Sequence, residues 1–143
     1  MSHVTKLDLA VYDRPRDWQA LERTCAILGL EKRQQTHYRK WGASGECICA
    51  LGVPGNLTAY EVGLVADSKG VMTFQFDDWQ EGHGLIDKIG WRGEKLTQEF
   101  ARQRALLALQ EEGFDVASVT VLADGTIDVE ARPGVQYQFA SLF

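Results

Sequence analysis

No stretch of this sequence approaches the roughly 20 consecutive apolar residues that a membrane-spanning helix needs. The first residues, MSHVTKLDLAVYD, also lack a basic segment followed by a long apolar one, so we expect no secretory signal. Cysteine is scarce: the chain has three, an odd number, and the pattern Cys47-Ile48-Cys49 does not easily close its own bridge. These features predict free thiols in a reducing compartment, and hence a cytoplasmic protein.

The bulk composition is that of an ordinary globular domain. The chain has 143 residues, of which 45% are hydrophobic and 24% charged, enough to bury a core without disulfides or metal. Its net charge of −5 argues against non-specific coating of nucleic acid, because that affinity comes from neutralising phosphates. No repeat or linker interrupts the sequence, so we predict one domain over residues 1–143, with the tail 133–143 either an edge strand or flexible.

Hydrophobic periodicity predicts the elements of the first half. Residues 4–11 alternate as a strand does, and residues 13–29 have a helical stripe, with Asp13 as N-cap, Pro15 in the first turn and Gly29 at the end. Alternating runs then follow, separated by the turn-forming segments GASG, VPGN and DSKG: residues 33–41, 46–51, 59–65 and 71–76. These runs predict a meander of up to four antiparallel strands.

The second half begins with helices and ends with a hairpin. We expect a short helix at 85–89 and a long one that stops at Gly113. Two alternating runs flank Asp124-Gly125, the favoured chemistry of a tight hairpin turn. The resulting order, β-α-β-β-β-β-α-β-β, predicts a two-layer α+β fold: a mainly antiparallel sheet of about six strands with the helices packed on one face.

Several short motifs occur in the same order as in a known family. They are the start MSH with Thr5-Lys6, YEVGL at 60–64, FDDW at 76–79, and a late segment that runs from LTQEFARQRALLALQEEGFDV to VLADGTIDVEAR. In these features the chain resembles the small cyanobacterial, plastid and phage proteins called hypothetical chloroplast open reading frame thirty-five. It departs from them in its longer middle hairpins and its tail beyond Arg132. The resemblance implies a fold and a cytosolic compartment (host cytosol if phage-encoded, stroma if plastid-encoded), and no activity.

The stretch FDDWQEGHG places two aspartates and a histidine directly after an alternating run. Asp77, Asp78 and His83 would form the centre of a small-ligand binder or an enzyme if their side chains converged on one point. Strand alternation instead sends Asp77 and Asp78 to opposite faces. The favoured interpretation is structural: one aspartate caps the following turn, and Trp79 is an anchor in the core or at its rim. We predict no catalytic residue.

The cysteines raise the question of a metal. Cys47 and Cys49 share one strand face, and with Cys25 and His37 they would offer zinc four soft ligands. A single C-x-C spacing without a second pair is weak support for such a site, and free cysteine is commonly buried. We therefore predict no metal and no cofactor. Redox activity of the thiols requires an exposed cysteine with a lowered pKa, and the sequence shows neither exposure nor pKa, so that question stays open.

Two segments suggest nucleic-acid binding. Gly90-Trp91-Arg92-Gly93 lies between two expected helices, like the GXXG loop with which KH domains clamp single strands, and Arg92 and Lys95 would suit phosphates. The same pattern also fits a helix–helix elbow that needs small residues. The basic run 32–41 contains aromatic residues as well, but these point to opposite faces, so a solvated edge strand is favoured.

We therefore predict a small non-catalytic accessory protein that acts by binding another macromolecule as an adaptor or regulator. Tryptophan and arginine dominate binding hot spots, and three of the four tryptophans fall in loops or at strand ends. A protein is the expected partner, nucleic acid is the alternative, no membrane is involved, and a homo-oligomer is allowed. The candidate binding residues are Trp41, Trp79, Trp91, Arg92 and Lys95.

Overall fold

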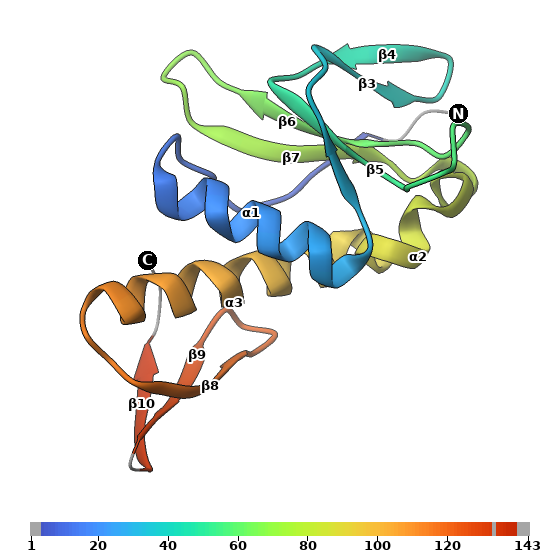
Figure 1. Cartoon of the computed structure of the whole chain (residues 1–143). Coiled ribbons are helices and arrows are strands. Elements are labelled where there is room, and N and C mark those ends of the chain that lie inside the picture. Colours follow the sequence, from blue (N-terminus) through green and yellow to red (C-terminus); the bar gives the residue numbers. More distant parts are fainter. Residues whose placement is uncertain (1–3, 133, 140–143) are drawn as a thin grey trace.

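The computed structural model describes residues 4–132 and 134–139, in which a first strand and helix are followed by a run of antiparallel strands, a group of helices and three last strands (Figure 1). The predicted α+β class is confirmed. The helical elements are α1 (Pro15–Leu28), the 3-10 turn η1 (Trp79–Gly84), α2 (Leu85–Ile89), the 3-10 turn η2 (Trp91–Gly93) and α3 (Glu94–Glu111). The strands are β1 (Val4–Lys6), β2 (Glu31–Arg33), β3 (His37–Lys40), β4 (Ala43–Glu46), β5 (Cys49–Gly52), β6 (Val62–Ala66), β7 (Met72–Asp77), β8 (Val116–Val121), β9 (Ile127–Ala131) and β10 (Val135–Phe139). Within these described residues, every helix is too short or too polar to cross a bilayer.

The main sheet has the strand order β1-β7-β6-β5-β2, and all its pairs are antiparallel. Its strand β7 alternates as predicted, with Met72, Phe74 and Phe76 buried on the face that carries the helices. α1 and α3 both lie along that face (Figure 1), and the rings of Phe74 and Phe100 meet edge to face with their centroids 5.4 Å apart. The prediction that helices pack on one face of the sheet is confirmed for this sheet.

Helix α1 begins and ends close to where the sequence predicts. Pro15 occupies its first turn, and Gly29 ends it with φ +72°, a left-handed conformation that glycine adopts without strain. The predicted N-cap is wrong: Arg14 holds that position, while the carboxylate of Asp13 accepts a hydrogen bond of 2.8 Å from Nε1 of Trp18. Asp13 therefore orients the indole of Trp18 instead of capping the helix.

A buried ion pair joins α1 to α3. The side chain of Asp17 is fully buried and accepts hydrogen bonds from Nη1 of Arg104 (3.1 Å), from the backbone N–H of Tyr12 (2.8 Å) and from Nε of Arg14. Burying a carboxylate is costly unless such donors replace water. The two helices are thus held in one register by a polar contact as well as by apolar packing.

The last three strands form a separate sheet of order β10-β9-β8 on the other side of α3 (Figure 1). The structure therefore has a third layer and more strands than the two layers and six strands expected from the sequence. The reason is that α3 has apolar residues on two sides. Leu96 and Phe100 enter the main core, whereas Ala105 and Leu109 form a second core with the hairpin residues Val119, Ile127 and Val129.

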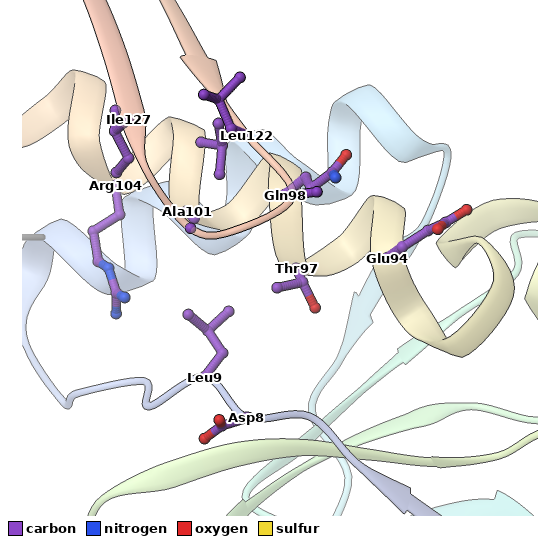
Figure 2. Close-up of a pocket in the computed structure, with 12 residues that line it drawn as sticks. Asp8, Leu9, Glu94, Thr97, Gln98, Ala101, Arg104, Leu122 and Ile127 are labelled. Atoms are coloured by element: carbon purple, nitrogen blue, oxygen red, sulfur yellow. The ribbon is translucent and has the colours of Figure 1, made fainter. Parts of the chain in front are cut away.

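The predicted hairpin itself is confirmed. Gly125 has φ +88°, and the carboxylate of Asp124 accepts the N–H of Thr126 at 2.9 Å, a local bond that stabilises the turn. Figure 2 shows Leu122 and Ile127 of this hairpin opposite Ala101 of α3. Within the tail, 135–139 form the edge strand β10; residues 133 and 140–143 lie outside the described part of the chain.

A two-stranded hairpin, β3 with β4, lies against β5 and β6 of the main sheet. Its buried Tyr38 lies directly over β6, where a Cβ at Gly63 would come within 2.2 Å of the tyrosine ring. The predicted strand 33–41 is therefore split into β2 and β3, and the chain turns at Trp41-Gly42, with most of the predicted GASG turn forming β4. This arrangement brings Trp41 to the end of β7.

Candidate functional site

The last residue of β7, Asp77, connects two of the predicted binding tryptophans. Its carboxylate is fully buried; Oδ2 accepts the backbone N–H of Trp41 at 3.1 Å, and Oδ1 accepts that of Trp79 at 2.9 Å. Trp41 is in the β3–β4 turn and Trp79 begins η1, so one side chain fixes two segments that are far apart in sequence. The bond to Trp79 confirms that an aspartate caps the turn after β7.

The turn after Trp79 is left-handed. Gln80, Glu81, Gly82 and His83 have φ angles of 49°, 56°, 63° and 53°, with positive ψ throughout. Three of these four residues carry a Cβ, and each such residue costs roughly 1–2 kcal/mol in this conformation. Periodicity and composition predict only a turn here. Residues such as Gln80, Glu81 and His83 have no sequence pattern that indicates a left-handed conformation. The surrounding structure must therefore hold it.

The segment before β6 supplies that support. The backbone N–H of Tyr60 donates to the carbonyl of Gly82 at 2.8 Å, and Nδ2 of Asn56 reaches the carbonyl of His83 at 3.5 Å. The exposed ring of His83 meets the buried ring of Tyr60 edge to face, with centroids 4.9 Å apart. Asn56 also caps its own loop by accepting the N–H of Ala59 at 2.9 Å. The left-handed turn is thus fixed from one side by a single loop.

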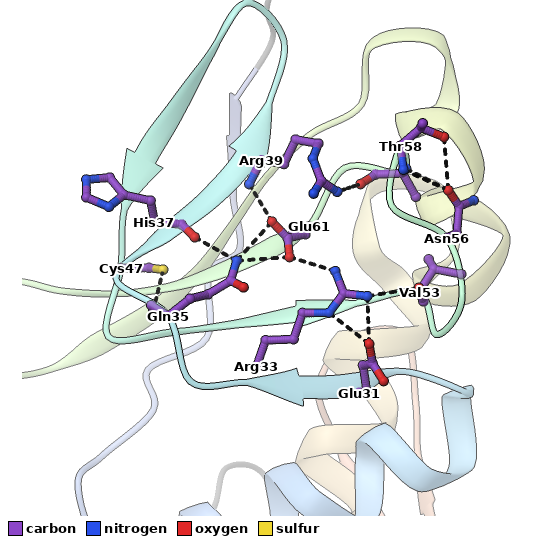
Figure 3. A network of polar contacts seen from close by, with 11 residues as sticks. Glu31, Arg33, Gln35, His37, Arg39, Cys47, Val53, Asn56, Thr58 and Glu61 are labelled. Atoms are coloured by element: carbon purple, nitrogen blue, oxygen red, sulfur yellow. Dashed lines mark hydrogen bonds and ion pairs between the residues drawn. The ribbon is translucent and has the colours of Figure 1, made fainter.

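That loop and β3 are anchored in turn by a second buried carboxylate, Glu61 (Figure 3). Glu61 is 2% exposed and accepts hydrogen bonds from Nη1 of Arg33 (2.9 Å), Nε2 of Gln35 (3.0 Å) and the N–H of Arg39 (2.8 Å). The Arg39 guanidinium also donates to the carbonyl of Ala59 at 2.7 Å. Sequence reasoning missed this cluster; the available signal was one acidic residue inside the apolar run AYEVGLV.

These contacts present an apolar and polar surface at the end of β7, which we call the Asp77 surface: Trp41, Leu57, Trp79 and Gln80–His83. Trp41 is 45% exposed, and Leu57, in the Asn56 loop, is 77% exposed. Trp79 is half-buried and packs against the main core, so it is an anchor at the rim. Of the predicted binding tryptophans, the structure brings Trp41 and Trp79 together.

The other three candidates lie past α2, in and after η2. Trp91 is 59% exposed, and Arg92 and Lys95 are exposed as well, with Arg92 at φ 57°. The predicted helix–turn–helix geometry around the GXXG pattern is present. However, a Cβ at Gly93 would come within 3.0 Å of Leu7 and Phe76, so core packing already requires this glycine. That observation supports the interpretation of the segment as a helix elbow.

Asp77, Asp78 and His83 do not form a shared site in the structure. Asp77 is buried and occupied by backbone donors, Asp78 is half-buried, and His83 is exposed on Tyr60. Over residues 4–132 and 134–139, no three His, Cys, Asp or Glu side chains lie close enough to hold a metal ion. The arrangement gives Asp77 a positioning role for the backbone.

The thiols are free and have high pKa values. Burial, together with the neighbouring Cys49, raises the pKa of Cys25 from 9.0 to about 12, and burial raises that of half-buried Cys47 to about 11. Burial also raises the pKa of Cys49. A reactive thiol needs the opposite shift, because the thiolate is the nucleophile. All three are therefore placed as core or core-edge residues.

Comparison of the chain with protein-family models, curated proteins and solved structures found no match. The resemblance to the hypothetical chloroplast open reading frame thirty-five family stays a prediction.

The role of Asp77 is testable by Asp77→Asn, which keeps the side-chain size but removes the charge and one acceptor oxygen. One of the two tryptophan N–H groups then loses its partner, and we expect the free energy of unfolding to fall by about 1–3 kcal/mol in urea denaturation. Asp78→Asn is the matched control, because Asp78 is the half-buried neighbour and its side chain makes no hydrogen bond that caps η1. Equal stabilities of the two variants would contradict this role.

The raised thiol pKa values predict instability in alkali. The unfolded chain releases thiol protons from about pH 9, whereas folded Cys25 and Cys47 keep theirs to about 12 and 11. The free energy of unfolding should therefore fall as the pH rises from 9 towards 12. Urea titrations at several pH values measure this slope. Cys25→Ala should make it shallower, and an unchanged slope in that variant would argue against a buried protonated thiol.

Proposed function

We propose that this chain is a non-catalytic accessory protein that binds a protein partner through the Asp77 surface. The observation that carries the proposal is the left-handed turn Gln80–His83. Strained backbone conformations persist only where the surrounding structure imposes them, and they cluster at binding and switch sites. Here the strain coincides with exposed apolar side chains from two other segments, Trp41 and Leu57.

The chemistry of the surface suits a protein partner. Trp41 and Leu57 offer apolar area, and the exposed side chains of Gln80, Glu81 and His83 supply polar contacts around it. The backbone beneath is tied down by Asp77 and Glu61, so little conformational freedom is lost on binding. The free cysteines fit a protein of the cytosol or the stroma, which we include in the proposal.

Binding of single-stranded nucleic acid is the alternative function, through Arg92 and Lys95 beside the GXXG turn. The exposed placement of both cations supports it. The acidic residues Asp87 and Glu94 are also exposed next to them, which weakens a phosphate-binding surface. This function requires retention on RNA that falls steeply as salt is raised.

An affinity pulldown from the native host tests the proposal. We expect Trp41→Ala and Leu57→Ser to remove one partner that wild type retains, because each deletes exposed apolar area from the Asp77 surface. Ile27→Ala is the matched control: Ile27 is 54% exposed on α1, outside that surface. If Trp41→Ala captures the partner as well as wild type does, and Trp91→Ala does not capture it, the binding site lies at η2 and the proposal is overturned.

A further inference from the structure

A cleft of about 460 Å³ lies between α3, the β8–β9 hairpin and the segment that follows β1 (Figure 2). This volume is in the range of small-molecule sites. Its apolar lining comes from all three elements: Leu9 after β1, Ala101 on α3, and Leu122 and Ile127 on the hairpin. None of the residues of the Asp77 surface lines the cleft, so a ligand bound in it is independent of the proposed protein partner.

One end of the cleft is formed by Arg104, whose guanidinium lies to the left of Leu9 in Figure 2. Arg104 is 8% exposed, with Nη1 donating to the carbonyl of Ala10 (2.7 Å) and to Asp17 (3.1 Å). Its Nε and Nη2 donate to no atom of the residues that the structure describes. Arg104 lines the cleft, and a guanidinium with N–H groups that the protein does not use is suited to a carboxylate.

The other end is acidic and polar. Glu94 is exposed at this end, and Thr97 and Gln98 follow it along α3, whereas Asp8 is exposed directly beside Leu9 (Figure 2). Glu94 and Arg104 are ten residues apart on one helix, and thus about 15 Å apart along its axis at roughly 1.5 Å per residue. An extended ligand with a negative charge at each end would meet repulsion at Glu94.

We propose that this cleft binds a small amphipathic monoanion: an apolar body that bears a single carboxylate. The carboxylate pairs with Nε and Nη2 of Arg104, and the apolar body lies along Leu9, Ala101 and Leu122. Thr97 and Gln98 can donate a hydrogen bond to a carbonyl on that body, and can donate to or accept from a hydroxyl. The acidic end selects against dicarboxylates and against phosphate esters with two charges.

Titration of the full-length ¹⁵N-labelled chain with octanoate, followed by NMR, tests the proposal. Octanoate should saturably shift the Nε–H of Arg104 and the amides of Ala101 and Gly125. 1-Octanol and octanedioate should each bind at least about tenfold more weakly than octanoate. 1-Octanol loses the charge-assisted hydrogen bond, and octanedioate adds a repulsion. These readouts need no substitution of Arg104, whose loss would leave Asp17 short of a partner.

Ala101→Phe should abolish the octanoate shifts, because the larger side chain fills the cleft, whereas Ala26→Phe on the exposed side of α1 should leave them unchanged. Equal or tighter binding of 1-octanol or octylamine would overturn the assignment of a carboxylate. Unchanged octanoate binding by Ala101→Phe, or no saturable shift in wild type, would overturn the site.

Discussion

The buried carboxylate of Asp77 is the interaction on which the candidate binding surface depends. It lies where β7 ends, and both of its oxygens accept backbone N–H groups, one from the β3–β4 turn and one from η1. A charge without water must be matched by donors of this kind, so the position of Trp41 is linked energetically to that of Trp79. Removing both oxygens of this side chain would release two segments together.

The left-handed turn is the observation from which we propose a binding function for this arrangement. Three non-glycine residues at roughly 1–2 kcal/mol each amount to about 3–6 kcal/mol, a large part of the about 5–15 kcal/mol that stabilises a typical domain. A right-handed turn would avoid this cost. Its retention beside Trp41 and Leu57, supported by Asn56 and Tyr60, is the reason to assign the binding role to this end of the sheet.

How much of this could be predicted from the sequence depends on the range of the contacts. The boundaries of α1, the helix at 85–89 and the Asp124-Gly125 turn follow from local signals, namely Pro15, Gly29 and hydrophobic periodicity, and the structure places them close to the predicted positions. The second core could not be predicted, because the apolar residues on both sides of α3 show that two partners exist and do not identify them. Separate sheets and a single sheet fit the same alternation.

The candidate site divides in the same way. The capping role of the aspartate that ends β7 and the exposure of Trp41 and Trp91 follow from local pattern. The Trp41–Asp77 bond, the Glu61 cluster and the left-handed turn arise from contacts between segments distant in sequence, which periodicity does not encode. The cleft at Arg104 belongs to this second group, since three separate segments line it.

Site-specific photo-cross-linking in the native host tests the central claim most directly. A photoreactive phenylalanine analogue replaces Trp41 in one variant and Ile27, a comparably exposed residue on α1, in another. Binding through the Asp77 surface predicts one discrete adduct with a protein from position 41 and none from position 27. Adducts of equal yield and identity from both positions, or an adduct from position 27 alone, would contradict it.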